Sequence, residues 1–254
     1  MNSQSPVRQR PFRIGQIVPS SNTTMETEVP AILHGRESIR PERFTFHSSR
    51  MRMHKVTKEE LEAMNLESLR CAAELADARM DVMSTACLVA IMAMGHGYHR
   101  ATERALTEVV RANHCQAAVM TSAGALVEGL KAMGARRISL MAPYMRPLTD
   151  LVVGYIQHEG IEVVDSLCFE IPDNLEVGAR DPMRLLEDVR RLDTTGVDVV
   201  VASACVQMQS LRALEPLQQQ LGLRVTSTAA CTVRRMLDHL GLEPVAPGAG
   251  AVLQ

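Results

Sequence analysis

Seven short runs rich in β-branched and apolar residues recur along the chain, and longer amphipathic stretches separate them. Each run has the length of a strand, and the stretches between runs are long enough to hold a crossover helix. Strands that alternate with helices indicate parallel sheets whose faces are covered by those helices. We therefore predict an α/β fold with strands at residues 12 to 18, 80 to 86, 116 to 122, 136 to 142, 161 to 167, 197 to 204 and 223 to 228.

Several helix boundaries are marked by residues that favour the first or last turn of a helix. Thr57 with Glu60 matches a capping box, and Asp181 with Pro182 matches an N-cap followed by proline at the first helical position. A glycine after a helical run is typical of a helix C-terminus. We expect such ends at Gly134, Gly160, Gly222 and Gly241.

The chain also contains a repeat, because three strand ends of its first half recur in the same order in its second half. The matching segments are residues 13 to 19 with 137 to 143, 84 to 87 with 202 to 205, and 121 to 123 with 227 to 229. Such a pattern indicates a duplicated α/β unit.

The repeat predicts two pseudo-symmetric parallel-sheet halves, residues 12 to 122 and residues 123 to 228. The helical stretch at 229 to 243 is expected to pack back on the N-terminal half. Ligands of open α/β sheets bind outside the carboxyl ends of the strands. Matched strand ends would therefore lie on facing rims of one cleft, with Cys87 opposite Cys205.

Cys87 and Cys205 each follow a short apolar run that ends in small residues, where a strand gives way to a helix. A thiol there meets free backbone N–H groups and the positive end of a helix dipole, which favours the thiolate by lowering its pKa. A single cysteine in such a run is more often a small buried apolar residue. The pair at equivalent positions favours a catalytic role, whereas structural roles are expected for Cys71, Cys115, Cys168 and Cys231.

The composition indicates a globular chain that binds a small molecule. A length of 254 residues with 46% hydrophobic content is enough for one large α/β core or two smaller ones. The formal net charge is -2, and no stretch concentrates Lys and Arg. A nucleic-acid partner or an anionic membrane surface would require a concentrated basic face. Neither partner is therefore expected.

The N-terminal segment carries positive charge but lacks the apolar core of a signal peptide, and no stretch approaches the about 18 apolar residues of a membrane span. We therefore expect a cytoplasmic protein. Its six cysteines include no CxxC pair, which argues against a disulfide framework or a zinc ribbon. Residues 1 to 10 and 244 to 254 are expected to be loose ends.

Two further features bear on cofactors. His96 and His99 flank Gly97-Tyr98, but two histidines three positions apart with no recognisable third ligand form a weak metal pattern. The PGAGA segment of the tail lacks the Lys-Ser/Thr pair of a phosphate-binding loop. The sequence therefore predicts neither a metal nor an organic cofactor.

Six parts of the chain carry a family resemblance. They are PSSNTTME at 19 to 26, ACLV at 86 to 89, TSAGAL at 121 to 126, Pro143-Tyr144, Asn174 and SACVQ at 203 to 207. Together they resemble maleate cis-trans isomerases of the Asp/Glu racemase superfamily, and the similarity runs from about residue 12 to 240. The combination of PSSNTTME with both cysteines is specific, whereas either feature alone is weak.

The resemblance implies that Cys87 is the nucleophile and Cys205 its acid/base partner. It also implies a homo-oligomer, expected as a homodimer or homotetramer, and a place in maleate degradation fed by nicotinate catabolism. The substrate-binding set that we expect on this basis is Asn22, Tyr144, Asn174, Val89, Val206, Pro19 and Ser20. From local sequence alone Asn22 is more often a capping or turn residue, Tyr144 could equally be an ordinary surface tyrosine, and Asn174 could be a loop residue with no ligand.

The expected chemistry follows from the substrate. Maleate is an electron-poor alkene with a carboxylate at each end, and its double bond must become single before the carbons can rotate. Cys87 would add to one alkene carbon while Cys205 delivers a proton to the other, giving a covalent succinyl-cysteine. Rotation and reversal of both steps would release fumarate. Neutral hydrogen-bond donors can stabilise the carbanion without a metal.

Three alternatives remain open at this stage. An amino-acid or hydantoin racemase would use the same cysteine pair to exchange a proton on opposite sides of one carbon. An arylmalonate decarboxylase would need only the second cysteine, so Cys87 argues against it. A non-catalytic ligand-binding α/β protein would be favoured by the loss of one cysteine, but both are present.

Overall fold

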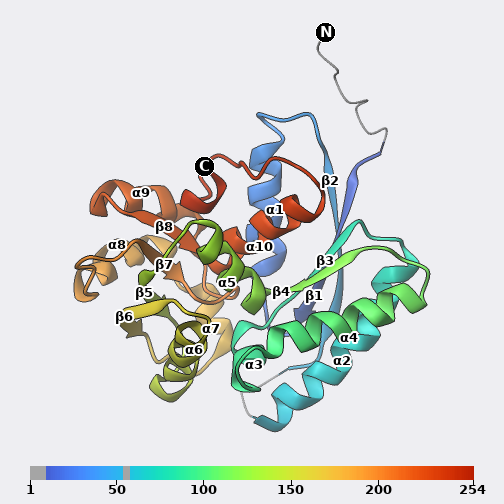
Figure 1. Ribbon diagram of the computed structural model, residues 1–254, viewed down its shortest axis with the longest axis horizontal. Helices are drawn as coiled ribbons and strands as arrows, with labels where there is room; N and C mark the ends of the chain where they lie inside the picture. The colour runs from blue at the N-terminus through green and yellow to red at the C-terminus, as the bar shows by residue number, and fades with distance from the viewer. Residues whose placement is uncertain (1–9, 54–57) are drawn as a thin grey trace.

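Two parallel sheets of four strands each form the framework of the molecule (Figure 1). The computed structural model describes residues 10 to 53 and 58 to 254. Thr57 of the expected capping box and residues 1 to 9 of the expected loose N-terminus lie outside the described residues.

The first sheet has the strand order β2-β1-β3-β4, and the second has the order β6-β5-β7-β8. Since the strands are numbered along the chain, the two orders are the same, as expected for a duplicated unit. The strands are β1 (Phe12–Pro19), β2 (Phe44–Met51), β3 (Val82–Thr85), β4 (Ala118–Thr121), β5 (Arg137–Ala142), β6 (Glu162–Cys168), β7 (Val199–Ser203) and β8 (Arg224–Ser227). The predicted α/β fold with two parallel sheets is confirmed.

Helices follow most strands and cover the sheets. The α-helices are α1 (Met25–Arg36), α2 (Lys58–Asp77), α3 (Leu88–Ala93), α4 (Tyr98–Ala112), α5 (Ser122–Ala132), α6 (Arg146–His158), α7 (Asn174–Ala179), α8 (Leu185–Asp188), α9 (Leu211–Leu221) and α10 (Thr228–His239). Three short 3-10 helices complete the elements: η1 (Pro182–Arg184), η2 (Val189–Arg191) and η3 (Ala251–Leu253).

The predicted helix ends are found where the sequence indicated them. The Asp181 carboxylate accepts a hydrogen bond from the Met183 N–H at 3.0 Å, and Pro182 opens η1. The four glycines expected after helices all adopt positive φ, the left-handed conformation that L side chains disfavour. They are Gly134, Gly160, Gly222 and Gly241.

All seven predicted strands are present, but β2 was not predicted. Its sequence, FTFHSSRM, is polar through the middle, and only three of its residues are buried. β2 is the edge strand of the first sheet and pairs with β1 from Phe44 to Met51. An edge strand can leave much of its surface in water, so it lacks the apolar run that identifies a buried parallel strand.

The two sheets begin in the same way. A carboxylate oxygen of Asp81 accepts the backbone N–H of Arg13 at 2.8 Å, and a carboxylate oxygen of Asp198 accepts the N–H of Arg137 at 2.9 Å. Each aspartate also donates its own backbone N–H to the carbonyl of the same arginine. The duplication therefore extends to the hydrogen bonds that join the central strands.

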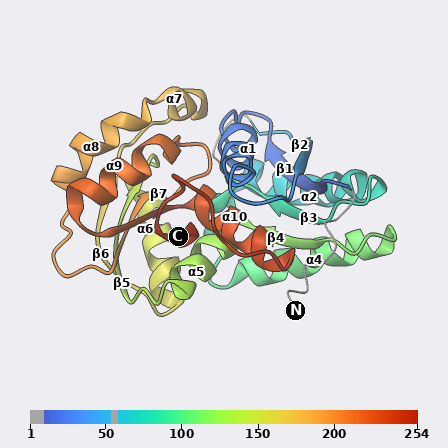
Figure 2. The same cartoon turned by 90° about the horizontal axis from the view of Figure 1, so that it is seen from above.

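Helices α5 and α10 lie side by side in the middle of the molecule, between the two sheets (Figure 2). Each starts directly after the last strand of its sheet. The Thr121 hydroxyl caps α5 by accepting the Gly124 N–H, and the Ser227 hydroxyl caps α10 by accepting the Ala230 N–H. α10 also contacts α1 and β3, which precede it by more than half of the chain.

The expectation of a loose C-terminus at 244 to 254 is wrong. Ala249 and Val252 are fully buried, and η3 packs against α10 and β8. The Ala246 N–H donates to the Leu253 carbonyl at 2.9 Å, and Arg234 donates to the Val252 carbonyl at 3.1 Å. Small apolar residues between glycines have no periodic pattern, so their burial depends on the surface against which the tail folds.

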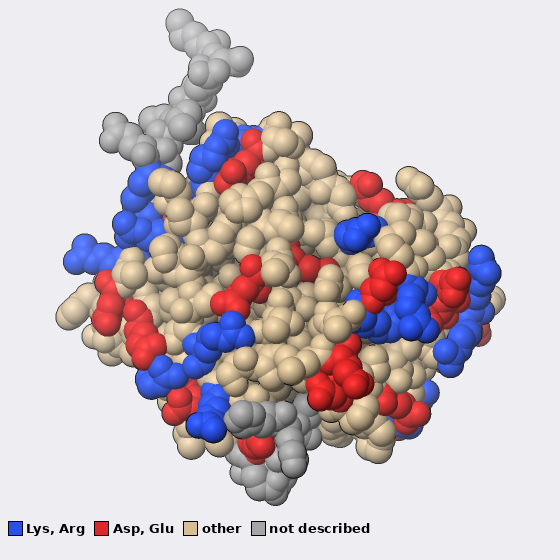
Figure 3. All heavy atoms as spheres, turned by 180° about the vertical axis from the view of Figure 1, so that it is seen from behind, with Lys and Arg blue, Asp and Glu red and all other residues tan. Residues whose placement is uncertain are grey.

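No helix in the part of the chain that the structure describes is long and apolar enough to cross a membrane. On the face drawn in Figure 3, acidic and basic side chains are interspersed and no broad field of one sign is present. Ion pairs such as Arg100 with Glu159 and Arg137 with Glu162 also bring opposite charges together from segments that are distant in sequence.

Candidate active site

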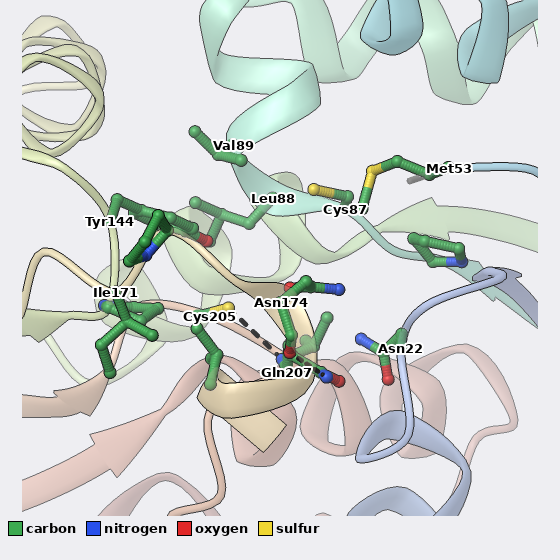
Figure 4. A pocket seen from close by; sticks show the side chains of 15 residues that line it. Asn22, Met53, Cys87, Leu88, Val89, Tyr144, Ile171, Asn174, Cys205 and Gln207 are labelled. Atoms are coloured by element: carbon green, nitrogen blue, oxygen red, sulfur yellow. Dashed lines mark hydrogen bonds between the residues drawn. The ribbon is translucent and has the colours of Figure 1, made fainter. Parts of the chain in front are cut away.

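A cavity lies at the carboxyl ends of the central strands of both sheets (Figure 4). Pro19 ends β1, Pro143 follows β5, and the two cysteines come two residues after β3 and β7. The space not filled by protein atoms is about 490 Å³, including the part open to solvent. The residues that line it are Pro19, Asn22, Met53, Cys87, Leu88, Val89, Pro143, Tyr144, Ile171, Pro172, Asn174, Val177, Cys205, Val206 and Gln207.

The two cysteines reach this cavity from equivalent positions of the two sheets. The Ala86 N–H donates to the Ile17 carbonyl at 3.0 Å, and the Ala204 N–H donates to the Met141 carbonyl at 2.9 Å. These bonds hold the residue before each cysteine against the central strand of its sheet. Cys87 is the N-cap of α3, and the peptide bond that precedes it is cis.

Burial dominates the ionisation of Cys87. The pKa of the thiol is raised to about 12, with burial as the largest cause; nearby Cys205 also raises it, and the N–H groups of Ala90 and Val89 lower it. These amides at the start of α3 act in the direction that the sequence indicated. The predicted lowering of the Cys87 pKa is nevertheless wrong, because the loss of water around the thiol outweighs the amides.

Cys205 is 8% exposed and is also held mainly in its thiol form, since burial raises its pKa. The predicted lowering is therefore wrong for Cys205 as well. The Tyr144 hydroxyl and the N–H groups of Gln207 and Met208 oppose this rise. The Gln207 N–H lies 3.3 Å from the sulfur. Cys205 thus has a hydroxyl and two amides that can stabilise its thiolate after it gives up a proton.

Tyr144 contributes a protonated hydroxyl to the cavity. Burial raises the pKa of its phenol well above the ordinary value, and both cysteines raise it further. The hydroxyl donates to the Ala204 carbonyl at 3.1 Å. Tyr144 therefore stays a hydrogen-bond donor across the physiological pH range and stands next to the second cysteine.

Asn22 caps a helix and also borders the cavity. Its side-chain oxygen accepts the N–H groups of Thr24 at 3.0 Å and Met25 at 2.9 Å, and so caps the start of α1. Its side-chain nitrogen makes no hydrogen bond to the described residues and is directed toward the cavity (Figure 4). Because the cap fixes the oxygen, the amide N–H groups are left facing a ligand.

Asn174 is the first residue of α7 and comes from the second half of the chain. Its side-chain nitrogen donates to the Ser21 hydroxyl at 2.9 Å, which joins α7 to the segment that carries Asn22. Asn22 and Asn174 therefore border the same cavity although 152 positions separate them.

The other expected substrate-binding residues differ in position. Pro19, Val89 and Val206 line the cavity. Ser20 does not line it, because its hydroxyl donates to the Met53 carbonyl at 3.2 Å and accepts the Met53 N–H at 3.0 Å. Ser20 thus supports Met53, whose side chain is part of the wall.

The sequence analysis did not assign seven lining residues: Met53, Leu88, Pro143, Ile171, Pro172, Val177 and Gln207. Gln207 lies within SACVQ, so the family segment was the signal that could have revealed it. Leu88 and Pro143 also lie within family segments, whereas Met53, Ile171, Pro172 and Val177 come from segments without a motif. None of the fifteen described lining residues carries a charge, so a ligand here meets neutral donors and apolar walls.

The two histidines singled out as a weak metal pattern lie elsewhere, against α6. The His96 ring stacks on His158 with 4.2 Å between ring centroids, and His99 Nδ1 is 2.5 Å from the Tyr155 hydroxyl. The described residues contain no group of three side chains that could hold a metal ion.

Comparisons with known proteins agree with this arrangement. Residues 14–253 match the family model described as arylmalonate decarboxylase. A maleate isomerase of Pseudomonas putida is 61% identical over 95% of this chain and 97% of its own length. A maleate isomerase of Geobacillus stearothermophilus is 58% identical over 95% of this chain and 97% of its own.

Solved structures give the same result. The maleate isomerase Iso of Pseudomonas putida S16 has a TM-score of 0.94 at 55% identity, over 96% of this chain and 98% of that chain. A mutant of the Nocardia farcinica maleate cis-trans isomerase carries a covalently bound succinylcysteine intermediate, with a TM-score of 0.92 at 44% identity over 96% and 98% of the two chains. Arylmalonate decarboxylase, at 20% identity and a TM-score of 0.75, shares the fold. By sequence and by fold, this chain belongs to the maleate isomerases, within the wider family that the arylmalonate decarboxylase model describes.

Proposed function

We propose that this protein isomerises maleate to fumarate without a cofactor, with Cys87 as nucleophile and Cys205 as acid and base. One observation carries the proposal: two thiols at equivalent strand ends line a single cavity whose other polar groups are neutral donors. Solved relatives support it, since a variant of the Pseudomonas putida S16 maleate isomerase contains maleate and the Nocardia farcinica mutant contains a succinylcysteine intermediate.

The proposed reaction starts with addition of the Cys87 sulfur to one alkene carbon. Because the pKa of Cys87 is about 12, the thiol must lose its proton to solvent before or during this step. The alkene electron pair moves to the other carbon and its carboxylate, and the Cys205 thiol donates a proton to that carbon. The product is a succinyl-cysteine with a single central bond.

Rotation about that bond then brings the two carboxylates to opposite sides. Cys205, now a thiolate, removes a proton from the carbon that it protonated, and the carbon–sulfur bond to Cys87 breaks to release fumarate. The backbone N–H groups of Gln207 and Met208 stabilise the Cys205 thiolate between the two steps. No electrons are gained or lost, so the reaction requires no redox partner.

The substrate carboxylates are assigned to the side-chain amides of Asn22 and Asn174 and to the Tyr144 hydroxyl. Each of these is a neutral donor at the edge of the cavity. Neutral donors hold an anion without pairing it to a fixed cation, so one carboxylate can leave its position while the other stays bound. We assign packing against the alkene to Val89, Val206 and Pro19.

The direct test is incubation of purified protein with maleate, followed by proton NMR for fumarate. Exhaustive chelation and dialysis beforehand should leave the rate unchanged, because the proposed steps use only groups of the chain. Activity that disappears on chelation and returns with a divalent ion would contradict this mechanism. Failure to form fumarate in either sample would remove the proposed function.

We further propose that the chain works in the cytoplasm as a homodimer or homotetramer, in maleate degradation downstream of nicotinate. The two halves at 12 to 122 and 123 to 228, with the 229 to 243 helix returning to the first, are proposed as its domains. Support for the halves comes from the identical strand orders of the two sheets. Light scattering after size-exclusion chromatography tests the oligomer, and a monomeric mass would contradict it.

A further inference from the structure

Gln207 is buried, with 2% of its surface exposed, and its amide lies between the Ser21–Thr23 segment and α7. Its side-chain oxygen accepts the Thr23 N–H at 2.9 Å. Its side-chain nitrogen donates to the Asn174 carbonyl at 2.6 Å and to the Ser21 carbonyl at 3.3 Å, and it lies 3.5 Å from the Thr23 hydroxyl.

These partners determine the orientation of the amide. The oxygen must face an N–H and the nitrogen must face the carbonyls, because the flipped amide would set two acceptors against each other. Both N–H groups are then directed at backbone carbonyls. The Gln207 side chain therefore holds the walls of the cavity together and has no donor left for a ligand.

The residues joined in this way are those assigned to the reaction. Ser21 and Thr23 flank Asn22, and Asn174 is bonded through its own carbonyl. The Gln207 backbone N–H lies 3.3 Å from the Cys205 sulfur. Gln207 thus connects the segment that carries Asn22, the start of α7 and the thiol of Cys205. Figure 4 shows its position close to Cys205 and Asn174.

The space around this amide is closely filled. A Cβ added to Gly178 in α7 would lie 2.6 Å from the Gln207 side-chain nitrogen and 2.7 Å from the Thr23 hydroxyl oxygen. Real Cβ atoms do not approach other atoms this closely, so an alanine at 178 would require the Gln207 amide or the Thr23 hydroxyl to move.

The loop that follows is tied to the first half at its far end. Glu28 of α1, a buried carboxylate, accepts the N–H groups of Ser210 at 2.5 Å and Leu211 at 2.7 Å. Residues 205 to 210 are therefore anchored at both ends by the segment that runs from Ser21 to Glu28. The part of the loop that contains Gln207 lies next to the cavity, whereas the part bonded to Glu28 lies at the start of α9.

We propose that Gln207 is a positioning residue, which sets the spacing between the amides of Asn22 and Asn174 and the thiol of Cys205. The inference rests on the proposed isomerisation and assigns Gln207 no contact with the reacting atoms. Loss of its side-chain bonds should therefore weaken binding of the dicarboxylate more than it slows the chemical steps.

The chain offers a matched control. Gln209 is in the same loop, and its side-chain nitrogen donates to the Gly178 carbonyl at 2.6 Å, but it does not line the cavity. Gln207→Met and Gln207→Glu should raise KM for maleate by about tenfold or more, the scale of one lost buried hydrogen bond. The effect on kcat should be smaller. Gln209→Met and Gln209→Glu should leave both constants within about twofold.

A second pair of variants displaces the amide without removing it. Gly178→Ala should raise KM as the Gln207 variants do, because the added methyl group meets the amide. Gly154→Ala, in α6, has no described atom within 4 Å of its Cβ and should leave KM unchanged. If Gly178→Ala had a normal KM, or if the Gln207 and Gln209 variants had the same constants, the positioning role would be overturned.

A third readout does not depend on isomerase activity. The backbone N–H of Gln207 lowers the pKa of the Cys205 thiol. Loss of the side-chain bonds in Gln207→Met should weaken this contact. The pH profile of Cys205 alkylation by iodoacetamide should therefore move to higher pH. The Gln209→Met profile should match that of the unmodified protein. A shift in Gln207→Met with no fumarate from the unmodified protein would refute the proposed function while retaining the positioning role. Identical profiles in all three proteins would refute the positioning role.

Discussion

Cys87 and Cys205 occupy equivalent positions, but their surroundings suit them to different tasks. Burial disfavours the thiolate of Cys87, and the backbone N–H groups of two residues of α3 favour it. Cys205 has a tyrosine hydroxyl in addition to two amides. A group that alternates between thiol and thiolate benefits from more donors, which agrees with Cys205 as acid and base. Cys87, which leaves the thiolate state by forming a carbon–sulfur bond, needs fewer.

Replacement of either cysteine should affect chemistry and leave folding intact, because both side chains line the cavity. Cys87→Ala should abolish fumarate formation, since Cys205, the other thiol of the cavity, supplies the proton and no second thiol is then left to add to the alkene. Cys205→Ala should lower kcat by about 10²–10⁴, the usual contribution of a general acid. Proton NMR measures the rate of fumarate formation, and circular dichroism tests whether each variant is folded. Substantial activity in Cys87→Ala would show that another group adds to the alkene.

The raised pKa of Cys87 also predicts how stability depends on pH. Its value of about 12 lies above the 9.0 of an exposed thiol, so its contribution to stability is complete below pH 9 and is lost as pH rises toward 12. Between pH 8 and 10 the free energy of unfolding of Cys87→Ala should fall by about 1 kcal/mol less than that of the unmodified protein. Urea titrations at both pH values measure this, and equal falls would contradict the raised pKa.

At the scale of elements, the crossing of α5 and α10 joins the two sheets. A Cβ on Gly129 of α5 would lie 2.6 Å from the Cys231 sulfur and 2.9 Å from its Cβ. The helices therefore approach so closely that one of them needs glycine at the crossing. Arg235 of α10 also forms an ion pair with Glu103 of α4, with N–O distances of 2.6 and 2.8 Å. This pair joins α10 to a second helix of the first half.

Gly129→Ala should accordingly lower stability by about 1–3 kcal/mol, the usual cost of overpacking. Combination with Cys231→Ala should recover part of this loss, because the sulfur is the nearer of the two atoms. Gly154→Ala is the control, since its Cβ meets no described atom and alanine favours a helix by about 0.5–1 kcal/mol. Thermal melts followed by circular dichroism compare the four proteins. Equal stability of Gly129→Ala and the unmodified protein would disprove the close crossing.

At the scale of the whole molecule, both halves and the C-terminal segment contribute to one core. The largest cluster of buried apolar residues includes side chains from both sheets and also Val252 and Leu253 of η3. The cavity is likewise lined by both halves, with Asn22 and Cys87 from one half and Asn174 and Cys205 from the other. A site of this kind exists only when the two halves are docked.

Removal of residues 246 to 254 should therefore destabilise the protein although the segment is distant in sequence from the site. Val252 and Leu253 are almost fully buried, and burial of each side chain contributes about 1.5–3 kcal/mol. The free energy of unfolding should fall by about 3 kcal/mol or more. Urea denaturation of the truncated chain tests this, with Leu253→Ala as a milder variant. An unchanged midpoint would mean that the tail does not pack as described.

Patterns in the sequence were enough to predict the α/β class, the repeat, seven of the eight strands and the strand ends that carry Cys87 and Cys205. Strands and turns are encoded locally, because apolar periodicity and turn residues act over a few positions, and the repeat is a comparison of such local patterns. The edge position of β2, the burial of the tail and the raised pKa of the thiols became known from the folded chain alone. The same holds for the hydrogen bonds of Gln207 to Ser21 and Thr23, which precede it by more than 180 positions. Desolvation and long-range contacts depend on atoms from distant parts of the chain, so no local pattern encodes them.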